Sequence, residues 1–186
     1  WLWYVVKDLP DALTPGAFEP TGVLFDNVRL VSMVPGAPLT QDRSAVLVLG
    51  DRITQIGAAG EISSPEGVVI VDGHGYTLMP GLIDAHIHLH DEAELAGYLA
   101  HGVTGLRNMS GYPFHLRLSK RIATGEILGP DFVTTGRILN SRGPNENALQ
   151  KTVTTAGEAR RAVRAQYRAG YRALKLYSNL TQDAFD

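Results

Sequence analysis

Two histidines separated by one residue, His86 and His88, stand in an apolar run that has the pattern of a buried strand. On a strand, residues i and i+2 project to the same side, so this spacing turns both imidazoles toward one point. Neutral imidazole is a common ligand of divalent metals. A lone His-x-His pair also occurs as ordinary solvated or hydrogen-bonded histidine, so its surroundings decide whether it indicates a metal site.

Four further residues extend this chemistry. Asp84 precedes the pair by one strand repeat and is expected on the same side, where it would brace a ligand or be buried. His90 continues the series but is expected to leave the strand for a loop. Lys175 and Tyr177 lie on a later short strand and share one of its faces. The alternatives are a snorkelling or ion-paired lysine and a packed aromatic side chain.

Composition excludes several classes of function. Hydrophobic residues make up 44% of the chain and charged residues 19%, which is typical of a globular protein. The formal net charge of -2 leaves no basic field that would hold nucleic acid, so small neutral or zwitterionic substrates remain open. There are no cysteines, so any metal must be held by His, Asp, Glu or modified Lys.

The chain starts with an apolar, aromatic run at residues 1–6 and has no initiator Met. Trp and Tyr favour the lipid headgroup region, so this run is compatible with the end of a membrane anchor or signal segment. An exported or membrane-anchored location is therefore favoured over the cytoplasm. The alternative is an N-terminal strand or arm packed on the body. Residues 7–20 are rich in Pro, Asp and Gly, so residues 1–20 are predicted to be an arm or linker.

The rest of the chain divides into two patterns. Residues 21–80 contain short β runs, including a hairpin that turns at Gly50-Asp51, and predict a small antiparallel sheet domain. From residue 81 strands alternate with helices, which predicts a parallel sheet over residues 81–186. The expected strands of this second part are near residues 82–88, 103–108, 131–135 and 172–177, and the helices near 92–101, 113–124 and 156–169. Thr155 and Glu158 have the spacing of a capping box for the last helix, and Gly170 is its expected stop.

Residues 79–90, MPGLIDAHIHLH, resemble the opening barrel strand of the amidohydrolase superfamily, Pro-Gly-x-Ile-Asp-x-His-x-His. Residues 102–108, GVTGLRN, and 125–130, GEILGP, resemble the second strand, and the link to the third, in the branch of imidazolonepropionase-like enzymes and metal-dependent prolidases. The resemblance covers the chain from about residue 21 to its end. Asn108 departs from it, because that branch commonly has Asp there, and this puts an acid role on the second strand in doubt.

The resemblance implies an α/β fold, namely a distorted (β/α)8 TIM barrel with a small N-terminal β-sandwich domain. Residues 21–80 would be the N-terminal part of the sandwich and residues 81–186 the first half of the barrel, since eight units need about 250 residues. The superfamily's histidines on strands five and six and its Asp on strand eight have no counterparts before Asp186.

The resemblance also implies a metal-dependent amidohydrolase in which metal-bound hydroxide attacks a C–N amide or peptide bond. His86, His88 and Lys175 would be metal ligands for one or two divalent ions, with zinc expected. Lys175, carboxylated by carbon dioxide, would bridge two ions, and Tyr177 is a candidate to touch substrate. Because Lys175 fits the binuclear prolidase-like group, a dipeptide or acyl-amino-acid amide is the favoured substrate. A homo-oligomer is also expected. The alternatives are an imidazolonepropionase-like hydrolase of cyclic amides and a noncatalytic amidohydrolase-like binding protein.

Overall fold

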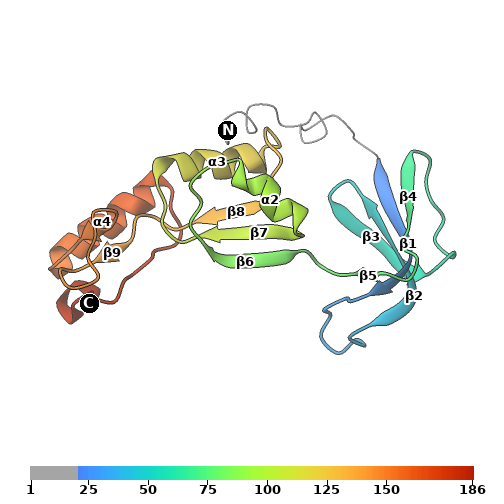
Figure 1. The fold of residues 1–186 in the computed structure, drawn as a ribbon, viewed down its shortest axis with the longest axis horizontal. Helices are drawn as coiled ribbons and strands as arrows, with labels where there is room; N and C mark the ends of the chain where they lie inside the picture. Colours follow the sequence, from blue (N-terminus) through green and yellow to red (C-terminus); the bar gives the residue numbers. More distant parts are fainter. Residues whose placement is uncertain (1–20) are drawn as a thin grey trace. The chain divides into compact units, whose positions relative to one another are not determined.

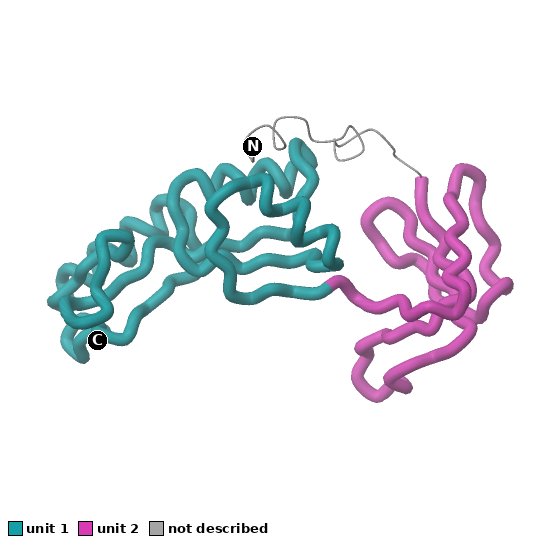
Figure 2. Tube along the Cα trace, in the orientation of Figure 1, with its two compact units in different colours: residues 1–15, 82–186 teal, residues 16–81 magenta. Residues whose placement is uncertain are grey.

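The computed structural model describes residues 21–186, so the expected arm or linker and the apolar run at residues 1–6 lie outside the described residues. The chain separates into two compact units between Gly81 and Leu82 (Figure 2). Among the described residues, no helix is long and apolar enough to cross a membrane.

The first unit is built on one five-stranded sheet. Its strands are β1 (Gly22–Leu30), β2 (Gln41–Leu49), β3 (Arg52–Ala58), β4 (Val68–Asp72) and β5 (Thr77–Leu78). The predicted hairpin is confirmed, since β2 and β3 pair antiparallel around Gly50-Asp51. Gly50 has a φ of 57°, a left-handed conformation that glycine adopts at little cost.

The prediction of a purely antiparallel sheet is wrong for β4, which runs parallel to β1. The strand order is β3-β2-β1-β4, so the chain leaving β3 must cross the sheet before it reaches the other side of β1. Ile62 lies in this crossing and is buried against Leu24 and Leu47, which ties the connection to one face of the sheet. A crossing of this kind brings β4 in along the direction of β1.

The second unit begins with a three-stranded parallel sheet. Its strands are β6 (Leu82–Ile87), β7 (Val103–Asn108) and β8 (Asp131–Thr134), hydrogen-bonded in that order. Two helices, α2 (Glu94–Ala100) and α3 (Pro113–Ala123), cover one face of this sheet (Figure 1). The side chains buried between them are Ile87, Leu89, Leu95, Leu106, Leu118 and Phe132. The α/β class predicted from the alternating pattern is confirmed, whereas the described residues form no closed barrel.

The remaining elements follow β8. They are β9 (Leu139–Asn140), β10 (Lys151–Thr152), α4 (Ala156–Ala169) and α5 (Gln182–Phe185). The strand expected at residues 172–177 is an extended segment with one parallel bridge, Leu139 to Leu176, rather than a full strand. The backbone of Leu139 makes the hydrogen bonds on both sides of that bridge. Its N–H donates to the Lys175 carbonyl at 2.9 Å, and its carbonyl accepts the Tyr177 N–H at 3.0 Å.

The caps of α4 act much as the sequence predicts. The Thr155 hydroxyl accepts the Glu158 N–H at 3.3 Å, and Gly170 ends the helix with a φ of 111°. The Glu158 carboxylate accepts the Thr154 N–H at 2.8 Å instead of that of Thr155, so the capping box is shifted by one residue. Tyr167 is exposed, although its spacing places it on the face of the buried Ala159.

Candidate metal centre

Strand β6 belongs to a sheet that has α2 and α3 on one face (Figure 1), and His86 lies in this strand while His88 follows its last residue, Ile87. Ile87, between them, is buried in the core, whereas His86 and His88 are exposed. Their ring centroids are 5.5 Å apart with an interplanar angle of 57°. Two imidazoles at this separation are neighbours on an open surface, which is the arrangement needed for both to approach one ion.

The expectation that Asp84 shares the face of the histidines is wrong. The pairing of β6 with β7 shifts between Asp84 and Ile87, which breaks the regular alternation of side chains. Asp84 pairs with the buried Leu106, and its charge contributes to the raised pKa of Tyr98 on α2, after the larger effect of burial. The Asp84 carboxylate accepts the N–H of His86 at 3.1 Å, so it fixes backbone instead of bracing an imidazole.

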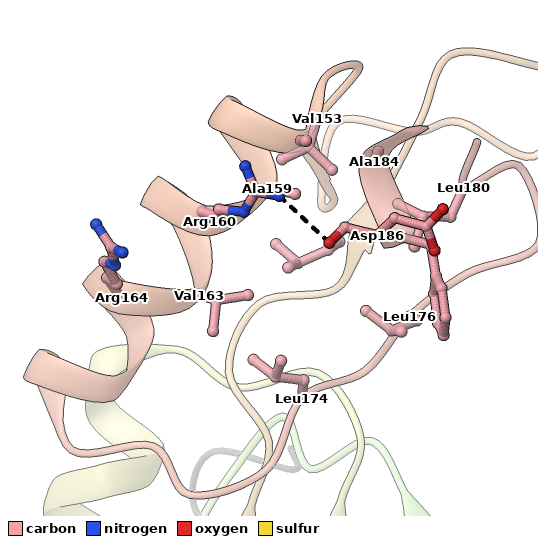
Figure 3. A pocket seen from close by; sticks show the side chains of 13 residues that line it. Val153, Ala159, Arg160, Val163, Arg164, Leu174, Leu176, Leu180, Ala184 and Asp186 are labelled. Carbon is pink, nitrogen blue, oxygen red and sulfur yellow. Dashed lines mark hydrogen bonds between the residues drawn. The ribbon is translucent and has the colours of Figure 1, made fainter. Parts of the chain in front are cut away.

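Lys175 and Tyr177 lie on the side of their segment that faces away from α4. Leu174 and Leu176, which alternate with them, line a hollow of about 240 Å³ beside α4 (Figure 3). Lys175 is partly buried and its Nζ is 6.0 Å from the centroid of the Tyr177 ring. The hollow itself is lined mainly by aliphatic side chains and holds neither histidine of the pair.

The pKa of His88 reflects charges from its own segment and from the segment of Lys175. Partial burial lowers the pKa of His88 below its ordinary value, and the positive charges of His86, Lys175 and His90 lower it further, in that order. Lys175 therefore acts on the imidazole although it is far away in the sequence. A lowered pKa keeps His88 neutral near pH 7, which is the form that binds metal.

Two buried side chains that the sequence analysis did not assign to the site hold the backbone just after the pair. The Leu89 N–H donates to Asn108 Oδ1 at 3.0 Å, and the Leu89 carbonyl accepts from His115 Nε2 at 2.9 Å. Asn108 also donates to Ser110 O at 3.2 Å and to Thr134 Oγ1 at 3.0 Å. The departure of Asn108 from the family pattern is the only sequence signal that pointed toward this arrangement.

Two of the other histidines, His101 and His74, have local partners. His101 Nδ1 lies 2.8 Å from the carbonyl of Gly97, and His74 Nδ1 lies 3.2 Å from an Asp72 carboxylate oxygen in the first unit. Residues 21–186 bring together no group of three or more His, Cys, Asp or Glu side chains able to hold a metal ion. The donor chemistry and closeness of His86 and His88 fit a divalent metal, for which they would supply part of a ligand set.

The chain is similar to several known hydrolases over part of their length. No family model matches the chain. The adenine deaminase of Gluconobacter oxydans is 38% identical in an alignment of 93 residues that covers 46% of this chain and 15% of that protein. The imidazolonepropionase of Alkaliphilus oremlandii is 52% identical in an alignment of 48 residues that covers 24% of this chain and 11% of that protein. A provisionally assigned prolidase from Bifidobacterium longum is similar in structure, with a TM-score of 0.69 and 29% identity over 84% of this chain and 40% of that one.

The matched part of this chain spans well under half of each of these proteins. The names of all three describe hydrolysis of carbon–nitrogen bonds.

Proposed function

This chain belongs to the amidohydrolase superfamily, and from that premise we propose that the whole protein is a metal-dependent hydrolase that cleaves a C–N bond in a small molecule. The observation that carries the proposal is the pair His86 and His88, with ring centroids 5.5 Å apart at the end of a strand of a parallel sheet. In barrel enzymes, active sites lie at the C-terminal ends of the strands, and β6 ends between these two histidines at Ile87.

The proposed architecture is the first half of a (β/α)8 barrel preceded by part of a β-sandwich. The parallel order β6-β7-β8 and the helices on one face of that sheet support the barrel. In the first unit, the exposed Ile53, Ile56 and Ile70 support a sandwich, because a single sheet with exposed apolar side chains is expected to pack on a second sheet.

The residues proposed to hold the metal are His86, His88 and, once carboxylated, Lys175. A bound divalent ion, with zinc expected, would lower the pKa of a water molecule and polarise the substrate carbonyl. His86 and His88 offer neutral nitrogen donors. Lys175 lies on the side away from α4, and its charge acts on His88, which supports a shared site. Carboxylation would convert this cation into an anion suited to bridging two ions, and Tyr177 beside it is the proposed substrate contact.

The favoured substrate is a dipeptide or an acyl-amino-acid amide, because Lys175 suits a binuclear, prolidase-like site and the Bifidobacterium longum structure extends over 84% of this chain. A cyclic amide or amidine is the second candidate, because the relatives matched by sequence are an imidazolonepropionase and an adenine deaminase. A noncatalytic binding protein is the third reading, and bound metal together with turnover would exclude it.

The test is hydrolysis by the full-length protein after removal of metal and reloading with zinc. Xaa-Pro dipeptides and acyl-amino acids, cyclic amides, and adenine are offered in parallel, with and without chelator. Chelator-sensitive turnover of at least one class is expected, strongest for dipeptides or acyl-amino acids. Turnover that survives complete metal removal would overturn the metal-dependent reading, and turnover of cyclic substrates alone would replace the favoured substrate by the second candidate.

A further inference from the structure

We infer that Asn108 and His115 are positioning residues that hold the peptide groups beside His88 and thereby preset its imidazole for metal. This inference rests on the proposed function, because it takes His88 to be a metal ligand. Neither side chain touches the metal site, and each acts through the backbone of Leu89.

The two side-chain bonds to Leu89, called the clamp below, follow directly after the last paired residues of β6 and β7. The last paired residues of β6 and β7 are Ile87 and Asn108, and the Met109 N–H donates to the Ile87 carbonyl at 2.9 Å. One residue past His88, both backbone groups of Leu89 are bound by side chains, the N–H by Asn108 and the carbonyl by His115. His88 therefore stands between two anchored residues although the regular strand has already ended.

Both clamping side chains are locked in orientation. Asn108 is 0% exposed and His115 is 1% exposed. His115 Nδ1 accepts the Tyr112 N–H at 2.9 Å, so the ring proton must sit on Nε2, which donates to Leu89. The Asn108 amide nitrogen donates to Thr134 Oγ1 and Ser110 O, which turns its oxygen toward Leu89. Neither group can rotate without leaving a buried polar atom unpaired.

This arrangement supports ligand binding because a metal site loses affinity when its ligands must be ordered at the moment of binding. With the backbone on both sides of His88 fixed, only its side-chain torsions remain to be set. Exposed imidazoles on a fraying strand end would lack this restraint.

Two substitutions of His115 separate its bond to Leu89 from its bond with Tyr112. A glutamine nitrogen can replace Nε2, so His115→Gln keeps the donor to Leu89 and weakens the bond from Tyr112. An asparagine oxygen can replace Nδ1, so His115→Asn keeps the bond from Tyr112 and releases Leu89. Each variant gives up one hydrogen bond of His115, either the partly buried one from Tyr112 or the buried one to Leu89. A merely structural role of His115 would leave the zinc affinity and the His88 signals alike in the two variants.

The experiment measures zinc affinity by competition with a chelator, in the full-length wild type and both variants. The metal-free proteins are also compared by the imidazole ¹⁵N NMR signals of His88. We expect His115→Asn to bind zinc about tenfold more weakly than wild type and to give broadened or multiple His88 signals. His115→Gln should stay within about threefold of wild type.

Equal zinc affinities and equal His88 signals in the two variants would overturn the inference. A wild type that binds no zinc would instead refute the proposed function. The positioning of His88 would in that case be judged on the NMR comparison alone, where unchanged signals in His115→Asn overturn it and altered signals support it.

Discussion

Replacing Asn108 by Asp changes one atom of a fully buried side chain, and we expect this to destabilise the full-length protein by about 2–5 kcal/mol at pH 7. The Asn108 amide nitrogen donates to Ser110 O and Thr134 Oγ1, and Thr134 in turn donates its own hydroxyl proton to Thr135 O. A carboxylate would place an oxygen against two acceptors. The loss combines one buried and one partly buried hydrogen bond, each costing about 1–3 kcal/mol when one partner is left unsatisfied.

The assay is denaturant unfolding of Asn108→Asp beside Asn147→Asp. Asn147 is exposed and uses only its Oδ1, which accepts the Leu149 N–H at 3.0 Å, so its change should stay within about 0.5 kcal/mol. Burial raises the pKa of a carboxyl group, so Asn108→Asp should lose stability as pH rises through that raised value and recover part of it toward pH 5. Equal unfolding free energies for the two variants, or a deficit that grows in acid, would refute the reasoning.

Burial lowers the pKa of His115, so the unfolded chain binds more protons in acid and stability should fall as pH drops below about 6.5. His115→Gln should flatten this dependence in urea unfolding across pH 5–8, and an unchanged pH profile would contradict it. Gly170→Ala should lower the free energy of unfolding by about 1 kcal/mol, because Gly170 ends α4 with a φ of 111°, a left-handed conformation that strains alanine. An unchanged stability in thermal unfolding would contradict this. Lys175→Ala should abolish activity, with partial recovery in acetate. A bare Lys175 amine beside a single occupied metal in active enzyme would make the bridging role wrong.

Local chemistry explains which elements the sequence predicted well. Strand β7 and helix α4 have the predicted bounds, Val103–Asn108 and Ala156–Ala169. Helix α4 is delimited by Thr155 and Gly170, whose capping roles depend only on neighbouring residues. The short elements β9, β10 and α5 were missed because two to four residues cannot display a hydrophobic period.

Long-range pairing explains the errors. The side taken by Asp84 depends on the register shift against β7, which no pattern within β6 encodes. The parallel direction of β4 depends on a crossing over the sheet of the first unit. The bond of His115 joins residues 26 positions apart, so His115 resembled an ordinary helix residue in the sequence. His86 and His88 could be predicted to lie together because residues two apart in an extended chain project to the same side. This placement depends on their spacing alone.

The central claim is that His86 and His88 hold a divalent metal in the full-length protein. Metal content is measured in the wild type, in the double variant His86→Ala and His88→Ala, and in His74→Asn, which alters an exposed histidine of the other unit. We expect at least one equivalent of metal in the wild type and in His74→Asn, and loss of that metal in the double variant. Unchanged metal occupancy in the double variant would contradict the assignment.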